Sequence, residues 1–412
     1  SSPRRIENVP PFLQKALPQY SHTPRIVTRE IRGNINTRIG YLSQPEDSPE
    51  KIDAAVLAFA GLTRLWDSPD GRQALEVLLA GLRWMVLPLR ECPAAPGQGA
   101  LAIECRTDDR VTRDLLAGIH CETTAATVEQ ERQVLAQAGG GCHQRFGATL
   151  EQHEGLGALL HVRGSGPDGA TMSELRWQAA DGKTADTDRL PSPGWDGSQW
   201  RDAAFSSHGI TDLPLPERLS NHSTGEDRAI FLAHARALPP HWSETFASTD
   251  QRIWTSGTQS WFRLAKLGIW IEGCAEGLGF ETVRPVLQKG VLQLPDLQDW
   301  TILTHAGAEK TWPCRDIIAT YAVHPSDLLD EHHPAVLALQ QAKSVFWTSG
   351  SQYDAFREWV PDNCAHACRL GKTYNYLRTQ LDAAKIAGLN VFPDVAHWRA
   401  LLDKKDPENE ST

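Results

Sequence analysis

Hydrophobic and polar positions along the chain fall into blocks that favour a mixed α/β protein. Short apolar runs such as AAVLAF (54–59) and ALAIECR (100–106) are bounded by turn residues, which is typical of buried strands. Longer stretches carry apolar residues at helical spacing, most clearly over residues 111–138. Strands that alternate with helices predict mostly parallel sheets covered by helices.

The first hundred residues are predicted to form a strand–helix series. SSPRR (1–5) has small hydroxyl residues before a proline, as in a helix N-cap and first turn. The segment 24–42 (PRIVTREIRGNINTRIGYL) predicts a strand, a Gly-Asn turn and a helix, and AAVLAF predicts a strand that enters a short helix. PAAPGQGALAIECR (93–106) predicts a turn-rich entry into another apolar strand. This block is therefore expected to contain a mostly parallel α/β layer.

The middle of the chain shifts from a helix to short strands and then to loops. Glycines 139–141 are expected to end the helix predicted over 111–138. After Cys142, GSGPDG (164–169) predicts a turn between two strands. Residues 181–227 are rich in Pro, Gly, Ser and Asp, which indicates loops and a linker.

A second α/β unit begins at RAIFLAHARAL (228–238) and contains an internal echo. RIWTSGTQSWFRLAKLG (252–268) is similar to VFWTSGSQYDAFREW (345–359), and each predicts a strand ending in Trp-Thr-Ser-Gly and then a helix. CRLGKTYNYL (368–377) predicts the end of another strand and a helix start, without the frame of a P-loop. Two related halves are expected here.

Composition excludes several classes of protein. The chain has 412 residues, 41% hydrophobic and 22% charged, which is ordinary for a globular protein of several domains. A formal net charge of -10 argues against a nucleic-acid partner, and the absence of an 18-residue apolar run argues against a membrane span. The N-terminal residues do not resemble a signal peptide and the eight cysteines are scattered, so a cytoplasmic protein without disulfides is expected. CAHAC (364–368) lacks a second ligand pair, so no metal site is expected.

Arginines of the first block are the strongest purely physical signal. Arg4 and Arg5 lie at the predicted helix start, Arg32 and Arg38 flank GNINT, and Arg64 follows AGLT. Guanidinium groups and helix N-termini together favour several carboxylates or phosphates. Solvated surface arginines are the alternative explanation on these spacings alone.

Five motifs within residues 1–150 resemble the hydroxymethylbilane synthase family, also called porphobilinogen deaminases. They are SSPRR, EIRGNINTR, LAFAGLTRL, APGQGALAIECR and GGGCHQRFGATL, in this order. The resemblance implies that the family's reaction joins porphobilinogen units head to tail and releases ammonia. It also implies a dipyrromethane cofactor, bound through a thioether to Cys142. The family's carboxylate-binding arginines correspond to Arg4, Arg5, Arg32, Arg38 and Arg64, and neighbouring contact positions correspond to Ser2, Gly33 and Gln98.

The resemblance also exposes a departure from the family. In that family a whole N-terminal domain, which carries the catalytic aspartate, precedes the SSPRR motif. Three explanations are open: the sequence is a fragment, a separate chain supplies that domain, or the block has lost deaminase activity.

The second unit resembles the uroporphyrinogen-III synthase family. Its motifs include AIFLAHARAL, TILTHAGAEKTW, IIATYAVHP and SVFWTSGSQYDAF. The implied reaction cyclises hydroxymethylbilane with inversion of the last ring, and a phenol near the leaving hydroxyl group could assist its departure. Tyr321 matches the tyrosine that the family has at that site. Carboxylate-binding positions correspond to Thr348, Ser349 and Thr373, with Thr255, Ser256 and Thr258 as their counterparts in the first half.

The sequence as a whole therefore predicts a multidomain α/β protein of tetrapyrrole biosynthesis that combines both families. Residues 1–118 are expected to form deaminase domain 2 with a returning segment of domain 1, both of them remnants of periplasmic-binding-protein-like lobes. The expected order continues with a small α+β deaminase C-terminal domain (119–215), a linker (216–228) and a two-lobed synthase-like domain (229–405). Porphobilinogen and hydroxymethylbilane are the expected substrates. The alternatives are a monofunctional synthase with a degenerate deaminase-like appendage, and a non-catalytic tetrapyrrole-binding protein.

Overall fold

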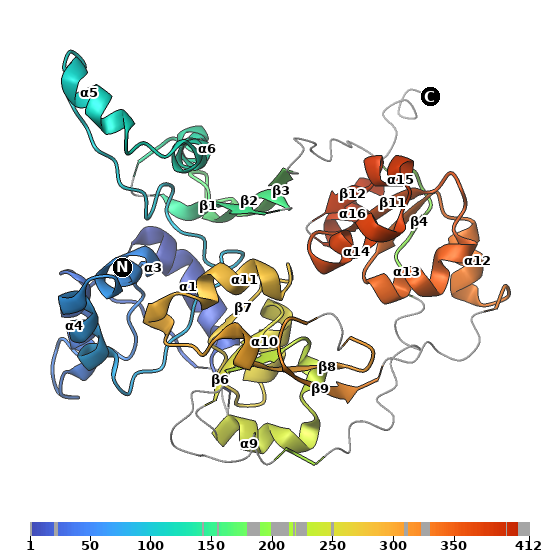
Figure 1. Cartoon of the computed structure of the whole chain (residues 1–412), viewed down its shortest axis with the longest axis horizontal. Helices are drawn as coiled ribbons and strands as arrows, with labels where there is room; N and C mark the ends of the chain where they lie inside the picture. Colours follow the sequence, from blue (N-terminus) through green and yellow to red (C-terminus); the bar gives the residue numbers. More distant parts are fainter. Residues whose placement is uncertain are drawn as a thin grey trace.

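The structure is a computed structural model, shown in Figure 1. It describes residues 2–19, 24–141, 144–154, 156–178, 190–198, 214–216, 219, 229–248, 251–308, 312–322, 330–392 and 394–402. We refer to four parts by name: the N-terminal block (2–119), the small sheet unit (122–178), the first lobe (229–322) and the second lobe (330–402).

The first lobe is built on a parallel sheet of five strands. The sheet order is β7-β6-β5-β8-β9, so the chain first builds outward from β5 on one side and then crosses to the other side. The described strands and main helices are β5 (Ala229–Leu232), β6 (Arg252–Thr255), α10 (Thr258–Ala265), β7 (Gly273–Cys274), α11 (Phe280–Leu287), β8 (Thr301–His305) and β9 (Asp316–Tyr321). This order is that of a doubly wound sheet, with its switch point between β5 and β8.

The second lobe repeats the same strand-then-helix unit in a smaller sheet. Its order is β12-β11-β10-β4, again parallel throughout. The elements are α12 (Pro334–Gln340), β10 (Ser344–Trp347), α13 (Gly350–Phe356), β11 (Ala365–Arg369), α14 (Lys372–Gln380), α15 (Ala383–Ala387), β12 (Asn390–Phe392) and α16 (Val395–Leu402). The expected strand-then-helix echo is confirmed, because β6 is followed by α10 and β10 is followed by α13.

One strand of the second lobe comes from a segment that the sequence assigns to loops. β4 (Gly194–Trp195) pairs with β10, and Figure 1 shows this green strand inside the orange and red lobe. The Trp195 indole is buried, lies edge-on to Trp347 and donates a hydrogen bond to the Ala335 oxygen at 2.9 Å. The proline and glycine residues around this tryptophan are typical of loops, so the composition does not predict the strand.

The small sheet unit joins a helix to an antiparallel sheet of three strands. α6 (Glu122–Gln137) covers β1 (Arg145–His153), β2 (Gly157–Ser165) and β3 (Thr171–Gln178), which pair in that order. The turn predicted at 164–169 connects β2 and β3, and glycines 139–141 end α6 as expected. The single helix predicted over 111–138 is instead two, because α5 (Arg110–Ala117) ends at Gly118 before α6 begins.

The N-terminal block contains helices and extended segments. Its main helices are α1 (Pro3–Ala16), α2 (Ile35–Gly40), α3 (Phe59–Trp66) and α4 (Pro69–Leu79). The helix starts predicted at SSPRR and GNINT are confirmed, since α1 begins just after Ser2 and the Asn34 side chain caps α2. The three strands predicted over 24–31, 54–59 and 100–106 are wrong, because the described residues of this block form no strand.

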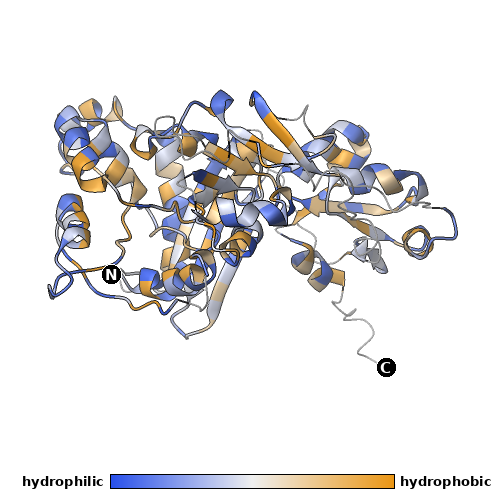
Figure 2. Cartoon of the chain, turned by 90° about the horizontal axis from the view of Figure 1, so that it is seen from below, coloured by the Kyte–Doolittle hydropathy of each residue, from blue (hydrophilic) through white to orange (hydrophobic). Residues whose placement is uncertain are grey.

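The reason for this error is that a strand exists only beside another strand. The apolar run at 100–106 has no hydrogen-bonded neighbour among the described residues, and Leu101 and Ile103 are 77% and 62% exposed. Figure 2 shows hydrophobic stretches, coloured orange, in extended segments near the N-terminus as well as in the sheets. The predicted parallel α/β layer therefore holds for the two lobes and fails for the N-terminal block.

The N-terminal block buries part of its apolar side chains against the first lobe. Phe12 and Ala16 of α1 share a core cluster with β5 and α10, and the Trp261 indole donates to the Ala16 oxygen at 3.0 Å. Ile39 and Leu75 join a second cluster with Trp254 and Phe280 of the same lobe. The block and the first lobe consequently share their hydrophobic cores.

Among the residues that the structure describes, no helix has the length and apolar character needed to cross a membrane.

Candidate functional site

Four arginines predicted from the first block gather at one place, which we call the arginine cluster (Arg4, Arg5, Arg38 and Arg64). Arg4 donates to the Gln98 side-chain oxygen at 2.6 Å, and Arg5 donates to the Val56 carbonyl at 3.0 Å. Arg38 Nε donates to the Gly33 carbonyl at 2.9 Å, and Arg64 donates to the Gly99 carbonyl. Arg4 of α1 and Arg64 of α3 thus contact the loop that carries Gln98, and Arg38 of α2 lies close enough to Arg5 to lower its pKa.

The electrostatics of this cluster favour an anionic ligand. Burial and the neighbouring charge of Arg5 lower the pKa of Arg4 to about 10, and burial together with Arg38 lowers the pKa of Arg5. Within the described parts of the chain, no carboxylate forms an ion pair with any of the four arginines. Bringing like charges together without a counter-ion is unfavourable, so carboxylates of a ligand would relieve the cost.

The other contact positions predicted from the sequence lie around this cluster, with one exception. Gly33 has a φ of 109°, and a Cβ there would lie 2.8 Å from Thr37, so the turn that presents Arg38 requires glycine. The Ser2 hydroxyl is buried and has no hydrogen-bond partner among the described residues. Arg32 is exposed beside Gly33, and no contact brings it to the other four.

Cys142 lies outside the described residues, but both ends of its loop are defined. Gly139, Gly140 and Gly141 all have positive φ values, of 88°, 69° and 90°. Gln144 then folds back, and its amide donates to the Ala138 and Gly140 carbonyls at 3.1 and 2.8 Å. The loop is therefore short and pinned at its base, between α6 and β1.

A buried glutamate that the sequence analysis missed joins α6 and β1 to the turn before Gln98. Glu131 of α6 accepts backbone N–H groups of Gly97 at 2.6 Å and of Leu150 at 2.8 Å. The Gly97 contact fixes the turn before Gln98, and the Leu150 contact fixes β1. Burial raises the pKa of Glu131 despite these two hydrogen bonds. Nothing in the pattern of a largely polar helix distinguishes this glutamate from its exposed neighbours.

The site residues predicted in the first lobe all lie at the carboxyl edge of its sheet. Thr255 ends β6, and its hydroxyl is buried without a partner in the described chain. The Ser256 carbonyl accepts the Gly277 N–H at 2.6 Å, and Thr258 is the first residue of α10. Open parallel sheets bind ligands at this edge.

Tyr321 lies at the same edge but far along it from Thr255. It ends β9, and two strands, β5 and β8, stand between β9 and β6. At about 4.8 Å per strand, this order separates the two residues by roughly 14 Å. Burial raises the pKa of Tyr321, with an opposing effect from Arg236, so the phenol keeps its proton at neutral pH. The His305 ring lies 5.8 Å from the Tyr321 ring, between centroids.

In the second lobe, hydroxyl groups predicted to bind ligand already have protein partners. Gln352, which is fully buried, accepts from both the backbone N–H and the hydroxyl of Thr348 at 2.7 and 2.9 Å. Ser349 caps α13 through the Gln352 N–H, and the Thr373 hydroxyl donates to the Thr348 carbonyl at 3.3 Å. Thr348 and Ser349 therefore have a clear structural role in this conformation.

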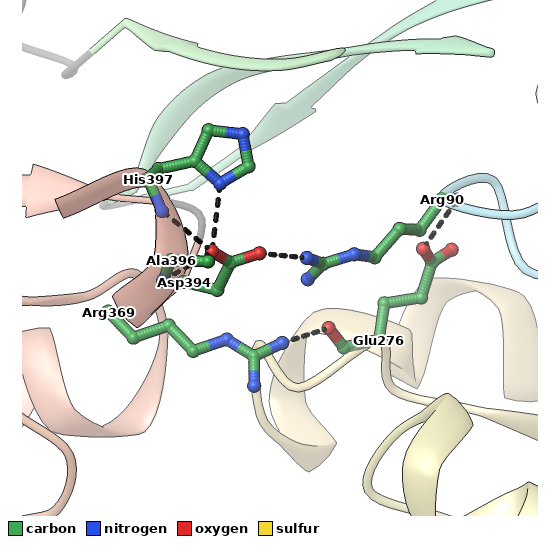
Figure 3. A network of polar contacts seen from close by, with 6 residues as sticks. All are labelled: Arg90, Glu276, Arg369, Asp394, Ala396 and His397. Carbon is green, nitrogen blue, oxygen red and sulfur yellow. Dashed lines mark hydrogen bonds and ion pairs between the residues drawn. The ribbon is translucent and has the colours of Figure 1, made fainter. Parts of the chain in front are cut away.

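The two lobes and the N-terminal block meet in one polar network, shown in Figure 3. The Glu276 carboxylate of the first lobe accepts N–H groups of Leu89 and Arg90 at 2.7 and 2.8 Å. Arg90 in turn donates to Asp394 of the second lobe at 2.9 Å, and Arg369 donates to the Glu276 carbonyl at 3.4 Å. We call this set of contacts the junction.

The junction closes the seam between the lobes. A Cβ on Gly277 would lie 2.5 Å from the Arg369 guanidinium, and a Cβ on Gly371 would lie 2.7 Å from the Gly277 carbonyl. The void beside them, lined by Arg90, His161, Glu276 and Arg369 among others, measures about 10 Å³, room for about one water molecule. A tetrapyrrole cannot enter this part of the seam unless the lobes move apart.

Comparison with known proteins finds a family match in the N-terminal part of the chain. Residues 1–114 match the family model described as "Porphobilinogen deaminase, dipyromethane cofactor binding domain". All four members of the arginine cluster, with Gln98, lie inside the matched range. The resemblance inferred from the sequence motifs is supported for this part of the chain.

Curated relatives agree with this match. A porphobilinogen deaminase of Listeria welshimeri is 36% identical over 166 residues, 40% of this chain and 48% of the relative. A porphobilinogen deaminase of Listeria monocytogenes is 41% identical over 130 residues, 32% of this chain and 38% of the relative. One of Geobacillus kaustophilus is 34% identical over 176 residues, 41% of this chain and 52% of the relative. The chain thus spans about half, or less, of the length of the relatives it matches.

Proposed function

We propose that this chain acts in tetrapyrrole biosynthesis, and that its N-terminal half holds a dipyrromethane cofactor and the carboxylated chain grown on it. The observation that carries the proposal is the arginine cluster, with guanidinium groups from three helices and no carboxylate partner among the described residues. Each pyrrole of such a chain brings carboxylates, and arginine binds them with paired donors at any working pH.

The donor set of this site fits the proposed cofactor. Arg4, Arg5, Arg38 and Arg64 would bind its carboxylates, and the Ser2 hydroxyl supplies a further donor without a protein partner. The cofactor supplies the covalent primer on which pyrrole units are added. Cys142, on the loop between α6 and β1, is the proposed attachment point, within the unit (119–215) that we assign to the cofactor cysteine.

A separate chain is the partner that we propose for the deaminase reaction. Of the exposed large hydrophobic side chains in the described structure, most lie in the N-terminal block, including Val27, Leu101, Ile103, Val111 and Leu115. A protein surface rarely leaves such a series uncovered without a partner. The deaminase step would then require that partner, which supplies the acidic catalytic group.

Mass spectrometry tests the cofactor proposal. The protein is incubated with porphobilinogen, alone and mixed with the N-terminal domain of the Listeria monocytogenes relative. We expect an adduct of two pyrrole units on Cys142 in the mixture, none in a Cys142→Ser variant, and less in an Arg4→Gln variant. An unmodified thiol in the mixture would support the alternative of a degenerate appendage. Raised salt should weaken retention of the carboxylated chain.

For the two-lobed unit (229–405) we propose a uroporphyrinogen-III synthase-like activity on hydroxymethylbilane. What supports it is the pair of parallel sheets with matching strand ends, and a buried, protonated Tyr321 at the carboxyl edge of one of them. Such a phenol could protonate a departing hydroxyl group. Formation of the type III isomer from freshly supplied hydroxymethylbilane, lost in Tyr321→Phe, would test the assignment. Tight binding without turnover would instead support a non-catalytic tetrapyrrole-binding protein.

A further inference from the structure

The switch point of the first-lobe sheet carries a row of three aromatic or imidazole side chains. β5 and β8 are hydrogen-bonded neighbours, and His234 and His305 both lie two residues beyond the paired positions Leu232 and Leu303. β9 comes next, and its Tyr321 is the register partner of His305. His234, His305 and Tyr321 therefore line adjacent strand ends, where open α/β sheets bind their ligands.

Helix α10 adds a cation to this row. The Ser260 hydroxyl accepts the Ala235 N–H at 3.2 Å, which fixes the first turn of α10 against the chain after β5. Arg263 lies three residues further on, so it lies on the same face of the helix as Ser260. Arg263 is exposed and makes no described ion pair, whereas His234 and His305 are half-buried.

Among the residues that the structure describes, the charged groups that act on His234 are Arg236, Arg263 and His305, and each of them lowers its pKa. His234 Nδ1 accepts the Arg236 N–H at 3.1 Å, so this nitrogen lacks a proton. Burial, Arg236, Arg263 and His305 together lower the pKa of His234 to about 4. The neighbours from its own segment, from α10, from β8 and from β9 are thus Arg236, Arg263, His305 and the neutral Tyr321. A neutral imidazole among cations gains a proton readily once a carboxylate arrives.

We propose that His234, His305 and Arg263 form a carboxylate-binding site that holds one acidic side chain of a linear tetrapyrrole beside Tyr321. The tetrapyrrole identity rests on the proposed synthase function, whereas the carboxylate class rests on the site itself. Arg263 supplies the paired donors, and His234 takes up a proton from solvent as the ligand binds. Neither histidine nor Arg263 belongs to the positions that the sequence resemblance identifies.

The test measures binding of uroporphyrin III by quenching of tryptophan fluorescence, at pH 7 and at pH 5.5. Arg263→Gln should weaken binding roughly 10- to 100-fold, the loss of a charge-assisted pair. The control is Arg284→Gln, which removes an exposed arginine paired with Glu281 on α11 of the same lobe and should leave affinity unchanged.

The pH dependence of uroporphyrin binding is a measurement that would not change if His234 had a purely structural role. If binding returns the pKa of His234 from about 4 towards its ordinary value, affinity should rise roughly 5- to 10-fold between pH 7 and pH 5.5. His234→Gln keeps an acceptor for the Arg236 N–H and should abolish most of this rise. The proposal is overturned if uroporphyrin does not bind, if Arg263→Gln binds as tightly as the wild type, or if His234→Gln keeps the full rise.

Turnover assays separate this inference from the proposed function. If Arg263→Gln weakens binding while the wild type forms no type III isomer, the carboxylate site stands and the synthase proposal fails. If the wild type forms the isomer and none of the variants alters binding, the synthase proposal stands and this site is wrong.

Discussion

In the first lobe the apolar runs of β5, β6 and β8 lie side by side, and each buries its residues in the shared sheet. In the N-terminal block the runs at 54–59 and 100–106 have a similar composition, yet no strand forms there in the described residues. The two regions differ in whether a neighbouring strand is present. The backbone N–H and C=O groups of a strand need a hydrogen-bonded strand beside them, and the composition of a segment does not provide one.

The two regions also differ in how they bring charges together. Several polar groups at strand ends of the lobes are paired, such as Arg252 with Glu272 and Thr348 with Gln352. The N-terminal block gathers guanidinium groups that have no carboxylate partner in the described structure. A scaffold that tolerates such crowding needs stability from elsewhere, and the shared clusters with the first lobe provide it.

The largest expected effect comes from removing the tryptophan that joins the two regions. Trp261→Ala should cost about 3–5 kcal/mol, because the indole is fully buried against Phe12 and donates to the Ala16 carbonyl. Hydrogen exchange should show loss of protection in both α10 and α1. Trp347→Ala is the matched control, since this buried tryptophan lies in the second lobe and its loss should leave α1 protected. If α1 stays protected in Trp261→Ala, the block does not depend on the first lobe.

Acid should act on the lobes before it acts on the arginine cluster. Burial, with the charge of Lys385, lowers the pKa of His366 to about 4, and its Nδ1 accepts the Trp347 indole N–H at 3.0 Å. Because the pKa of His366 in the folded protein lies below its ordinary value of 6.5, the unfolded chain takes up the proton first as the pH falls. The stability present above pH 6.5 is therefore lost as the pH falls towards 4. We expect a loss of about 1–3 kcal/mol over this window, measured by urea unfolding. His366→Asn should flatten the slope, and an unchanged slope would assign it to other groups.

The Glu131 contacts test how the Gln98 loop is positioned. Glu131→Gln should cost about 1–3 kcal/mol, because the amide replaces an acceptor oxygen by a donor opposite a backbone N–H. Exchange of the Gly97 and Leu150 amide hydrogens should accelerate. Glu129→Gln, an exposed residue of the same helix, serves as the control and should change neither quantity. Equal effects from both variants would contradict a specific role for Glu131.

The smallest expected effect comes from the exposed apolar runs. Leu101→Ser should change the free energy of unfolding by less than about 0.5 kcal/mol, because the side chain is 77% exposed. Leu337→Ser on α12 of the second lobe, at 44% exposure, gives the comparison from the other region. A loss above about 1 kcal/mol at Leu101 alone would show that another chain covers this run in solution.

Much of the candidate site was predictable because it depends on motifs that are local in the sequence. Arg4 and Arg5 lie in the first turn of α1, and Arg38 and Arg64 lie in the last turns of α2 and α3. All four belong to short motifs of the sequence, and the structure brings them together. Glu131, Glu276 and His234 were not predictable, because each acquires its role from a partner far away in the chain. The pairs Glu131–Gly97 and Glu276–Leu89 are separated by 34 and 187 residues.

The sequence by itself determined the local elements: the start of α1 at Ser-Pro, the end of α6 at its glycines, the turn between β2 and β3, and the repeated strand–helix unit of the two lobes. These depend on backbone preferences and capping that act within a few residues. Only the tertiary structure decided which apolar runs became strands, and that the N-terminal block shares its core with the first lobe. The same holds for the row formed by His234, His305 and Tyr321. Each of these outcomes requires a partner that is distant in sequence. A hydrophobic pattern indicates that a segment is to be buried, but it does not identify the segment against which it packs.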